Sequence, residues 1–417
     1  MAIISDRFID DTQPAFELSE IQKKYIRIFI DKCSSGEYSF EHLNCECGCN
    51  DFETIAKKDR YGIPVETVIC RNCGLIMTNP CLDSSSNNAF YDNEYHYIYR
   101  SEDKPSDDNF VQRKNEANNI IEFVRKHAKI YSGSVLEIGC ADGGNVAAFN
   151  EAGYNASGID LSHVYVNYGI EKGLNLYCSD AKSFAQTGDT FDLVVLNHVL
   201  EHFTHLENEL DIINSLLNPG GFLFIAVPGL KYLTFGAYNN DFLRMLQNAH
   251  IFNFSKDTLC QVMKKYGFDC IYANEFIYSV FKKGEKSSNF TNFYSENLNY
   301  LQTVEKYSDD NVSLIIIRAI EKISSYPDKR VILYGTAEEL DILVQNLPSL
   351  ESIKGFFYSD RKTPTEVIEY IQSSSNPSDK ECLVLTDAKN NKAFLEAFYA
   401  ASKRIGFELF SIYSEIF

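Results

Sequence analysis

The chain has 417 residues, 45% of them apolar and 23% charged, and its formal net charge is −19 at pH 7. This length and composition indicate a soluble globular protein of two or three domains. The negative charge argues against nonspecific binding to nucleic acid or anionic lipid, because phosphate binding needs clustered Lys and Arg. A local basic groove for an anionic small substrate stays open.

No apolar run approaches the roughly 18 residues that a membrane-spanning helix needs, so we expect no membrane insertion. The N-terminal stretch "MAIISDRFIDDTQPAF" has no basic region followed by an apolar core, and it therefore does not resemble a secretory signal. We expect a cytoplasmic protein, in which thiols stay reduced. Its twelve cysteines then favour metal binding over a disulfide framework.

The N-terminal third begins with residues 15–33, which space apolar side chains at helical intervals and predict a leading helix. A cysteine-rich segment follows, from about residue 40 to residue 81. The stretch "NPCLDSSSNNAF", residues 79–90, predicts a loop through its Asn, Pro and Ser content. Residues 90–100, "FYDNEYHYIYR", are unusually aromatic.

From about residue 112 onward, short apolar runs alternate with helical segments; the runs are "SVLEIG", "ASGID", "NLYCSD", "FDLVVLN" and "GFLFIAVP". This alternation predicts an α/β fold, a parallel sheet with helices on both faces. After a polar stretch, "RVILYG", "SIKGFFYSD", "KECLVLTD" and "FELFSIY" predict a second, smaller α/β domain. The expected parts are a helical extension (1–39), a cysteine module with an aromatic loop (40–111), the main domain (112–284) and the smaller domain (285–417).

Cys70 and Cys73 lie in the sequence C-x-x-C-G-L, a spacing typical of metal knuckles. The glycine permits the tight turn that surrounds a metal. A structural zinc ion takes four ligands in a tetrahedron, and two short cysteine hairpins supply such a set. This pair therefore predicts one half of a zinc site.

The other half must come from Cys45, Cys47 and Cys49, which occupy alternate positions. Either Cys47 or Cys49 can complete the set with Cys45. We favour Cys47 because Gly48 follows it, as a glycine also follows Cys73. The alternative is a group of reduced, buried thiols. The prediction is a structural Zn²⁺ held by Cys45, Cys47, Cys70 and Cys73.

Residues 135–144, "VLEIGCADGG", predict a strand, a glycine-bearing turn and a helix. Gly139 and Gly143 allow the backbone to approach a ligand, as in dinucleotide sites. The pattern is nevertheless E-x-G-x-x-x-G, with Glu137 inside the strand. It resembles the first motif of class I S-adenosylmethionine-dependent methyltransferases, although Ala141 replaces a glycine common in that family. A nicotinamide-binding fold is the alternative.

Later motifs follow in the order of the same family. Asp160 ends a strand about twenty residues beyond the turn, where a carboxylate can bind both ribose hydroxyls. "FDLVVLNHVLEHF" and "LLNPGGFLFIAVP" match the fourth and fifth strand motifs, and Asp180 occupies the position that faces the adenine. The resemblance thus implies S-adenosylmethionine as cofactor, bound by Glu137, Gly139, Gly143, Asp160, Asp180 and Asn197.

The order of parts over roughly residues 40–417 resembles the sugar C-methyltransferases, which act on nucleotide-linked deoxysugars. The resemblance implies a Rossmann-like methyltransferase core between a zinc module and a smaller Rossmann-like domain, with a nucleotide sugar as substrate. In that family a loop tyrosine, a histidine after the fourth strand and a Glu-His pair after the fifth strand surround the sugar. The matching catalytic residues here are Tyr95, Tyr97, His202 and His250, with His250 as base.

The family's glutamate is replaced by Ala249, which leaves O- or N-methylation open. His202 alternatively only shapes the cofactor pocket, and the two tyrosines alternatively pack the cysteine module onto the core. Glu201 is expected to be a solvated or capping carboxylate, and His198 a surface or structural residue.

The C-terminal domain has the strand–glycine–helix stretch "RVILYGTAEELDILVQNL" but no further glycines of a dinucleotide motif, so we expect no second cofactor there. It is expected to cover the active site and to bind the substrate's nucleotide or carrier. Two other functions stay open: methylation of RNA or protein with the zinc module as recognition element, and a scaffold that has lost catalysis.

Overall fold

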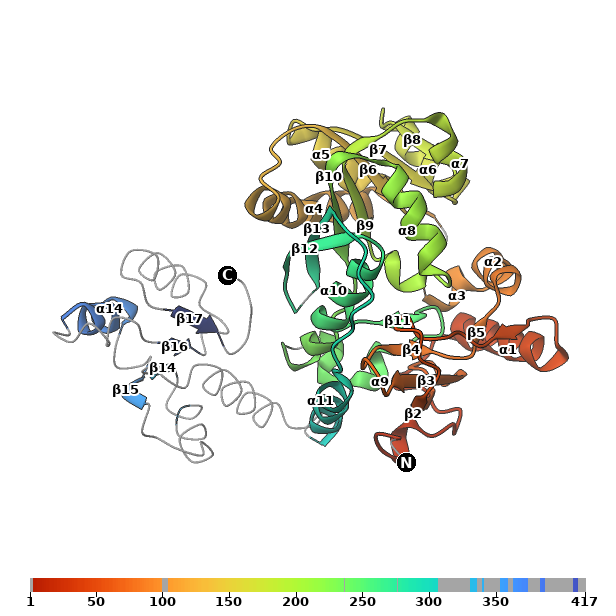
Figure 1. The fold of residues 1–417 in the computed structure, drawn as a ribbon. Helices are drawn as coiled ribbons and strands as arrows, with labels where there is room; N and C mark the ends of the chain where they lie inside the picture. Colours follow the sequence, from red (N-terminus) through yellow and green to blue (C-terminus); the bar gives the residue numbers. More distant parts are fainter. Residues whose placement is uncertain are drawn as a thin grey trace. The chain divides into compact units, whose positions relative to one another are not determined.

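A computed structural model describes residues 3–99, 104–235, 237–275, 277–306, 331–335, 340, 353–358, 363–373, 383–386 and 408–411. The chain divides into two compact units (Figure 1). The first unit comprises residues 1–232 and 242–302, and the second comprises residues 233–241 and 303–417. The helices of the described residues include none long and apolar enough to cross a membrane.

The leading helix predicted from the sequence is α1 (Glu20–Ser35). Ser19 and Gln22 form a capping box at its start, and Gly36 ends it in the left-handed conformation. Such a cap satisfies backbone donors that the first turn leaves unpaired. The apolar face of α1 buries Phe29 against Phe90, with ring centroids 5.0 Å apart. The helix is therefore packed onto the residues that follow the cysteines.

The cysteine module, residues 40–82, is built from short strands. They are β1 (Phe40–Glu41), β2 (Phe52–Lys58), β3 (Pro64–Cys70), β4 (Ile76–Thr78) and β5 (Cys81–Leu82). Its sheet has the order β11-β4-β3-β2, and β11 (Phe252–Asn253) comes from a segment nearly 180 residues further along the chain. The module therefore continues into the main domain through backbone pairing.

The aromatic stretch is helical, and the loop predicted for residues 79–90 is wrong over most of its length. Asp83 caps α2 (Ser84–Asn93) by accepting a hydrogen bond from the backbone of Ser86, and α3 (Tyr95–Tyr99) follows. The serines that indicated a loop fill the first turn of this helix, where side-chain caps favour them.

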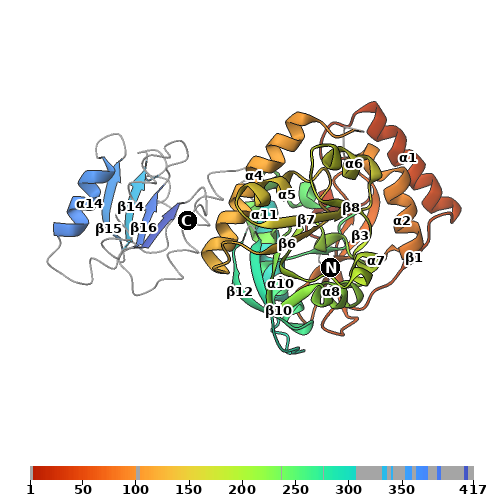
Figure 2. The same cartoon turned by 90° about the horizontal axis from the view of Figure 1, so that it is seen from above.

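The main domain has a seven-stranded sheet in the order β12-β13-β10-β9-β6-β7-β8 (Figures 1 and 2). All pairs are parallel except those of β13, which runs antiparallel to both neighbours. The strands are β6 (Ser134–Ile138), β7 (Asn155–Asp160), β8 (Leu176–Cys178), β9 (Phe191–Asn197), β10 (Leu217–Ala226), β12 (Phe268–Ala273) and β13 (Tyr278–Lys283). The five apolar runs of the sequence supply the five parallel strands, and the predicted Rossmann-like α/β fold is confirmed.

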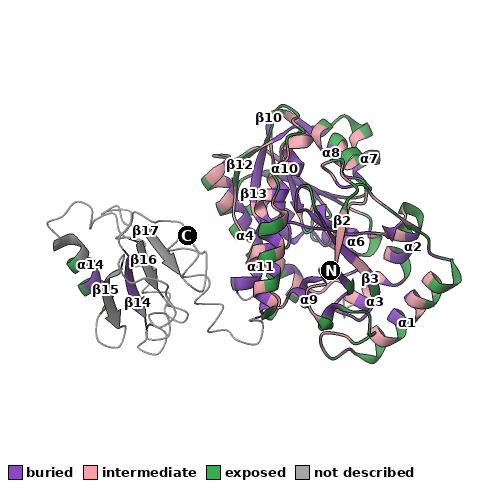
Figure 3. Cartoon of the chain, turned by 60° about the horizontal axis from the view of Figure 1, so that its bottom comes forward, coloured by how far each residue is buried: buried purple, intermediate pink, exposed green. Residues whose placement is uncertain are grey.

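Helices cover both faces of this sheet. They are α4 (Asp107–His127), α5 (Gly144–Glu151), α6 (His163–Glu171), α7 (Ala181–Phe184), α8 (Leu206–Ser215) and α10 (Lys256–Lys265). Two further helices, α9 (Phe242–Met245) and α11 (Tyr294–Lys306), contact the cysteine module: Arg60 donates to the Arg244 carbonyl and Asn297 to the Gly74 carbonyl. One core contains Val135 and Leu193 with side chains of α4 and α5. The other contains Leu136 and Val194 with side chains of α8, α10 and the cysteine module. Figure 3 shows buried residues concentrated in the strands and exposed residues along α1 and α2.

The second unit contains a parallel sheet in the order β15-β14-β16-β17. Its described elements are β14 (Val331–Gly335), β15 (Ile353–Tyr358), α14 (Pro364–Ser373), β16 (Leu383–Thr386) and β17 (Glu408–Ser411). All four strands fall in the apolar runs that predicted them. The smaller α/β domain is confirmed, while its role and the four domain boundaries stay predictions.

Candidate active site and cysteine metal site

The turn after β6 lies at the carboxyl edge of the parallel strands, where open α/β sheets bind their ligands. Gly139 and Gly143 have φ of 75° and 82°, and Ala141 has φ of 48°. A side chain on Gly139 would place its Cβ 2.6 Å from Val199 Cγ2. Glycine is thus required at position 139 by conformation and by space, as a close backbone approach predicts.

Asp160, at the end of β7, connects this turn to the next. Its carboxylate accepts hydrogen bonds from the backbone of Ala141 at 2.9 Å and of Ser162 at 2.8 Å. Each carboxylate oxygen keeps a further lone pair for a ligand hydroxyl. Beside it, Leu161 is 71% exposed, a large apolar side chain that the sequence reading missed. A carboxylate beside an open apolar surface fits a ribose attached to an aromatic base.

Glu137 lies inside β6 and is buried. Asn145 donates to its Oε1 at 2.6 Å, whereas Oε2 has no hydrogen-bond partner among the described residues. Burial raises the pKa of Glu137 to about 8. A buried carboxyl with one unpartnered oxygen fits a site that is completed by a polar ligand, because such groups are rarely left unpaired.

Asp180 lies just after β8, and Asn197 is the last residue of β9. In the sheet these two strands lie on opposite sides of β6. Asp180 is exposed and caps α7, accepting from the backbone of Ser183 at 2.6 Å. Asn197 is the last residue of β9 and stands opposite Ala226 of β10. The six residues predicted to bind the cofactor therefore lie in or just after β6, β7, β8 and β9. Their individual roles stay predictions.

Glu201, His202 and His250 form what we call the acceptor-side cluster. One ligand atom of each lies within 4.8 Å of the others, and the two imidazole centroids are 4.9 Å apart. Glu201 and His202 belong to the 3₁₀ turn η3 (Leu200–His202) after β9. His250 precedes β11 and is buried. The structure thus brings together the two histidines predicted from distant motifs.

Glu201 corrects the sequence reading. It was expected to be solvated, but only 1% of it is exposed. Its Oε1 lies 3.3 Å from His198 Nδ1 and 4.0 Å from His250 Nε2, and its Oε2 has no partner among the described residues. Desolvation lowers the pKa of His198, but the hydrogen bond to Glu201 and the charge of Glu201 outweigh it. The pKa of His198 is therefore raised above its usual value.

The two cluster histidines have different neighbours. Burial, with smaller effects of His202, Arg60 and His198, lowers the pKa of His250 well below its usual 6.5, so this imidazole is neutral near pH 7. Its Nδ1 is buried without a partner among the described residues. His202 donates from Nδ1 to the Ala249 carbonyl at 2.8 Å.

The tyrosines separate into two groups. Tyr95 packs beside His202, with centroids 6.3 Å apart, whereas Tyr97 stacks on Tyr25 of α1 at 3.9 Å. The structure therefore brings Tyr95 to the cluster and directs Tyr97 to the leading helix. Tyr91 was missed: its hydroxyl lies 2.8 Å from His202 Nδ1 and its ring stacks on Tyr95. A four-residue spacing pairs side chains on one helix, but Tyr91 lies in α2 and Tyr95 in the next helix, α3.

The cysteine module fixes the backbone around His250. Thr78 donates from its hydroxyl to the His250 carbonyl and from its backbone to the Ile251 carbonyl, each at 2.8 Å. Met77 of β4 then pairs with Phe252 of β11. Two residues before His250, the backbone of Asn248 donates to Asp59 of the β2–β3 turn at 3.0 Å.

Arg60, the residue after Asp59, also binds the segment before His250. The Arg60 guanidinium donates to Gln247 Oε1 at 2.8 Å, and the amide nitrogen of Gln247 contacts His250 Nε2. The segment from Gln247 to Phe252 is therefore bound on both sides of His250 by residues of the cysteine module.

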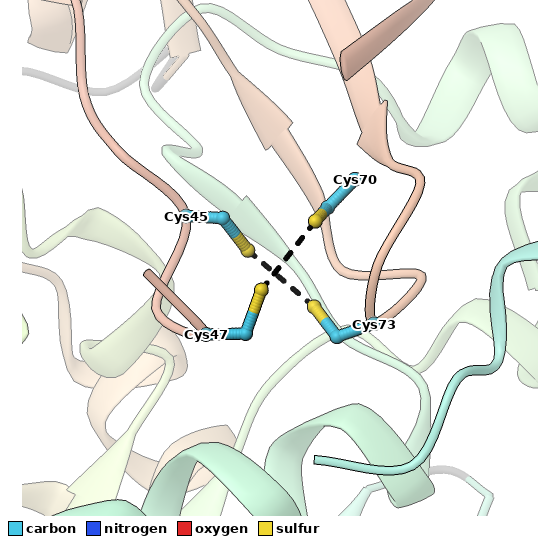
Figure 4. Close-up of side chains that lie close together, drawn as sticks. All are labelled: Cys45, Cys47, Cys70 and Cys73. Atoms are coloured by element: carbon cyan, nitrogen blue, oxygen red, sulfur yellow. Dashed lines mark hydrogen bonds between the residues drawn. The ribbon is translucent and has the colours of Figure 1, made fainter. Parts of the chain in front are cut away.

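Four cysteines point toward a common centre (Figure 4). The sulfurs of Cys45 and Cys73 are 3.4 Å apart, and those of Cys47 and Cys70 are 3.6 Å apart. All four ligand atoms lie within 4.8 Å of one another. Ligands of a tetrahedral zinc with Zn–S bonds of about 2.3 Å stand roughly 3.8 Å apart. The donor set and its spacing fit zinc.

Cys49 lies outside this group, because its sulfur accepts from the backbone of Asp51 at 3.3 Å. Hydrogen bonds that the Cys45 thiol donates to Cys70 and Cys73, together with burial, raise the pKa of Cys45. A bound cation reverses that effect, since coordination deprotonates the thiol.

Comparison with known proteins supports the domain assignment. Residues 111–273 match the family described as "Methyltransferase domain". A ubiquinone biosynthesis O-methyltransferase of Hydrogenovibrio crunogenus is 25% identical over 122 residues, 28% of this chain and 51% of that protein. One from Chromobacterium violaceum is 29% identical over 115 residues, 25% of this chain and 49% of that protein. The chain spans about half the length of these curated relatives.

Solved structures of similar fold include a Burkholderia thailandensis 1,6-didemethyltoxoflavin-N1-methyltransferase, with 15% identity and a TM-score of 0.37 over 51% of this chain and 96% of that one. The family match, the strand order and the turn after β6 agree with one another. Residues 111–273 therefore match a methyltransferase domain and have the α/β sheet of a Rossmann-like fold.

Proposed function

We propose that the protein transfers a methyl group from S-adenosylmethionine to a small molecule, a nucleotide-linked or otherwise carrier-bound sugar. The observation that carries the acceptor site is a pair of buried atoms, Glu201 Oε2 and His250 Nδ1, that have no hydrogen-bond partner in the described part of the chain. Both atoms belong to residues that follow strands β9 and β10. A polar group of the acceptor can satisfy both.

The sulfonium of S-adenosylmethionine supplies an already activated methyl group. The chain's own residues must then orient the nucleophile and remove its proton. The proton would go to His250 Nδ1, the ring nitrogen without a partner among the described residues. The other ring nitrogen, Nε2, lies 4.0 Å from the Glu201 carboxylate. A carboxylate in this position stabilises the charged ring, as in other carboxylate–histidine pairs. Such proton transfer contributes about 10²- to 10⁴-fold to a rate.

Glu201 also bears on the position that departs from the sugar C-methyltransferase pattern. That family has a glutamate before the histidine, where this chain has Ala249. The buried Glu201 supplies a carboxylate near His250 from a different turn. The carboxylate–imidazole pair is thus retained by other means, which supports proton abstraction from carbon or oxygen alike.

The four clustered cysteines would hold a structural zinc ion, leaving no ligand position for a reactant. Its contribution is to fix the hairpins of the module whose strand β4 and turn residues Asp59 and Arg60 bind the His250 segment. We infer that the metal supports catalysis indirectly, by fixing the base.

The alternative function, methylation of RNA or protein with the cysteine module as recognition element, needs a basic surface near the cysteines. Two basic side chains of the described residues are paired with glutamates of the cysteine module: Arg71 with Glu53 at 2.6 Å and Lys265 with Glu46 at 2.8 Å. This pairing favours a small-molecule acceptor. O-methylation is the second candidate within the proposed function, because the matched relatives are O-methyltransferases.

The test is mass spectrometry of a panel of nucleotide sugars and phenolic acceptors after incubation with enzyme and S-adenosylmethionine. A methylated nucleotide sugar supports the proposal, and methylation of phenols alone contradicts it. An acceptor deuterated at the candidate carbon identifies the atom that is methylated. Exchange of this deuterium into solvent without cofactor, if it is absent in His250→Ala, indicates methylation at carbon. Absence of turnover with every acceptor, despite tight cofactor binding, would favour the scaffold alternative.

A further inference from the structure

Two cysteines outside the metal site lie side by side. Cys260 belongs to α10 and Cys270 to β12, and their sulfurs are 3.1 Å apart. A disulfide bond is about 2.05 Å long, so the two atoms need to approach by only about 1 Å. Neither residue contributes to the acceptor-side cluster or to the cysteine metal site.

The proximity of these sulfurs is built into the packing of two regular elements. α10 buries Leu259, Val262 and Met263 in the core, and its Ser255 cap is part of a capping box. β12 is paired with β13, so that Cys270 stands opposite Phe281. The chain between the two elements is short, because only ten positions separate the cysteines. The backbones of α10 and β12 therefore hold the two cysteines side by side before any oxidation, with Cys270 next to a register shift in β12.

The pair is also accessible and chemically suited to exchange. Cys270 is exposed and Cys260 is partly exposed. Cys260 donates its S–H to the Cys270 sulfur, and this hydrogen bond lowers the pKa of Cys270. The thiolate is the nucleophile in thiol–disulfide exchange, so Cys270 is the sulfur that reacts first.

We propose that Cys260 and Cys270 form a reversible disulfide by exchange with a low-molecular-weight disulfide such as oxidised glutathione. The Cys270 thiolate attacks one glutathione sulfur and releases one glutathione thiolate. The Cys260 thiolate then attacks the Cys270 sulfur of the mixed disulfide and releases the second. Two protein thiols are oxidised, one glutathione disulfide is reduced to two thiols, and the two protons go to solvent.

The cross-link would join α10 to the edge strand of the main sheet. α10 begins at Lys256, shortly after β11, the strand that follows His250 and pairs with the cysteine module. Oxidation therefore stiffens the element next to the segment that holds the proposed base. The expected thermodynamic result is a higher unfolding temperature, because a native cross-link restricts the unfolded chain.

The experiment uses the full chain with its metal bound. The protein is incubated with oxidised glutathione, free thiols are blocked at acid pH, and peptides are mapped without reduction. We expect a peptide pair linked through Cys260 and Cys270, full reversal by dithiothreitol and an unfolding temperature raised by a few degrees. A stable glutathione adduct on Cys270, an intermolecular Cys270 dimer, or two free thiols would each overturn the proposal.

Two variants and one internal control sharpen the result. In Cys260→Ser, Cys270 should retain one glutathione, because no second thiol can displace it. In Cys270→Ser, neither the linked peptide nor the temperature shift should appear. Cys178 is the internal control: it is also exposed, but its sulfur lies 3.3 Å from the Leu161 carbonyl, and it should keep a simple adduct. Internal linkage in Cys260→Ser would contradict the assignment.

Discussion

The cofactor side and the acceptor side of this site are built in different ways. The cofactor side is a series of turns that follow β6, β7, β8 and β9 within one continuous stretch, and its contacts are mostly between neighbouring turns, as between Asp160 and Ala141. The acceptor-side cluster joins η3 to a segment almost fifty residues later, and the cysteine module binds that segment. The proposed cofactor side therefore depends on local conformation, whereas the proposed acceptor side depends on long-range packing.

Removing the Asp160 carboxylate should have the largest effect, and only on the cofactor side. Two charge-assisted hydrogen bonds contribute about 1.5–3 kcal/mol each, so Asp160→Ala should weaken S-adenosylmethionine binding by about 10²- to 10⁴-fold. The carboxylate also accepts from Ala141 and Ser162, which adds to the loss. Calorimetry measures the dissociation constant. Asp189→Ala, at an exposed position, is the matched control, and equal affinities would show that the turn is misassigned.

The reverse pattern is expected on the acceptor side. Glu201→Gln and His250→Ala should each lower turnover by about 10²- to 10⁴-fold and leave cofactor affinity unchanged. Orientation of the methyl donor stays intact, so residual activity should persist. Steady-state rates with the identified acceptor provide the measurement.

The controls for these two variants are Glu207→Gln and His205→Ala, which change exposed side chains on the same part of the chain. Normal turnover in His250→Ala would remove this residue from the mechanism and make His202 or Tyr95 the better candidate.

A smaller effect is expected when the hydrogen bonds between the cysteine module and the His250 segment are changed. Asp59 touches no proposed reactant, but it accepts from the backbones of Tyr61, Ile63 and Asn248. In Asp59→Asn an amide NH₂ must face at least one of these donors, which shifts the segment before His250. A misplacement of about 1 Å can cost about 10²-fold, so we expect turnover to fall by about 10- to 10²-fold.

Asp59→Asn should keep its metal and its cofactor affinity. The hydrogen bonds of Asp59 go to Tyr61, Ile63 and Asn248, none of which is a proposed metal or cofactor ligand. Asp51→Asn, at an exposed position of the same module, is the control. Turnover that falls equally in both variants would point to a general loss of stability.

The smallest effect is a displacement of the pH profile. The base must be neutral, and burial lowers the pKa of His250 below its usual 6.5. Raising the pH deprotonates the base, so activity should rise with pH and the acid limb should lie below pH 6.5. Turnover rates across that range at saturating cofactor give the profile. A limb at or above 6.5 would indicate an exposed histidine such as His198, whose pKa is raised.

The sequence predicted the strands and turns that carry the proposed cofactor residues, because the signals for them are local. A strand, a glycine turn and a helix within ten residues define the loop at Gly139, and successive apolar runs define the sheet. The group of four cysteines was equally predictable, since Cys45 and Cys47, like Cys70 and Cys73, lie close together in the chain. The structure then distinguished Cys47 from Cys49 by position.

The acceptor side was predicted only in part, because its geometry depends on contacts that sequence spacing does not contain. Glu201 was expected in solvent, yet the segment at His250 covers it. Tyr97 was grouped with Tyr95, but α3 is a helix, and positions two apart on a helix face different ways. Nothing in the local sequence indicated that β4 pairs with β11.

The most direct test of the account is hydrogen exchange measured with and without the metal. Chelation, or Cys70→Ser, should speed amide exchange in residues 244–254 while the turns at Gly139 and Asp160 stay protected and cofactor affinity is unchanged. Cys49→Ser, whose sulfur lies outside the cluster, should retain the metal and the native exchange pattern. Continued protection of residues 244–254 in the metal-free protein would contradict the claim that the cysteine module fixes the proposed base.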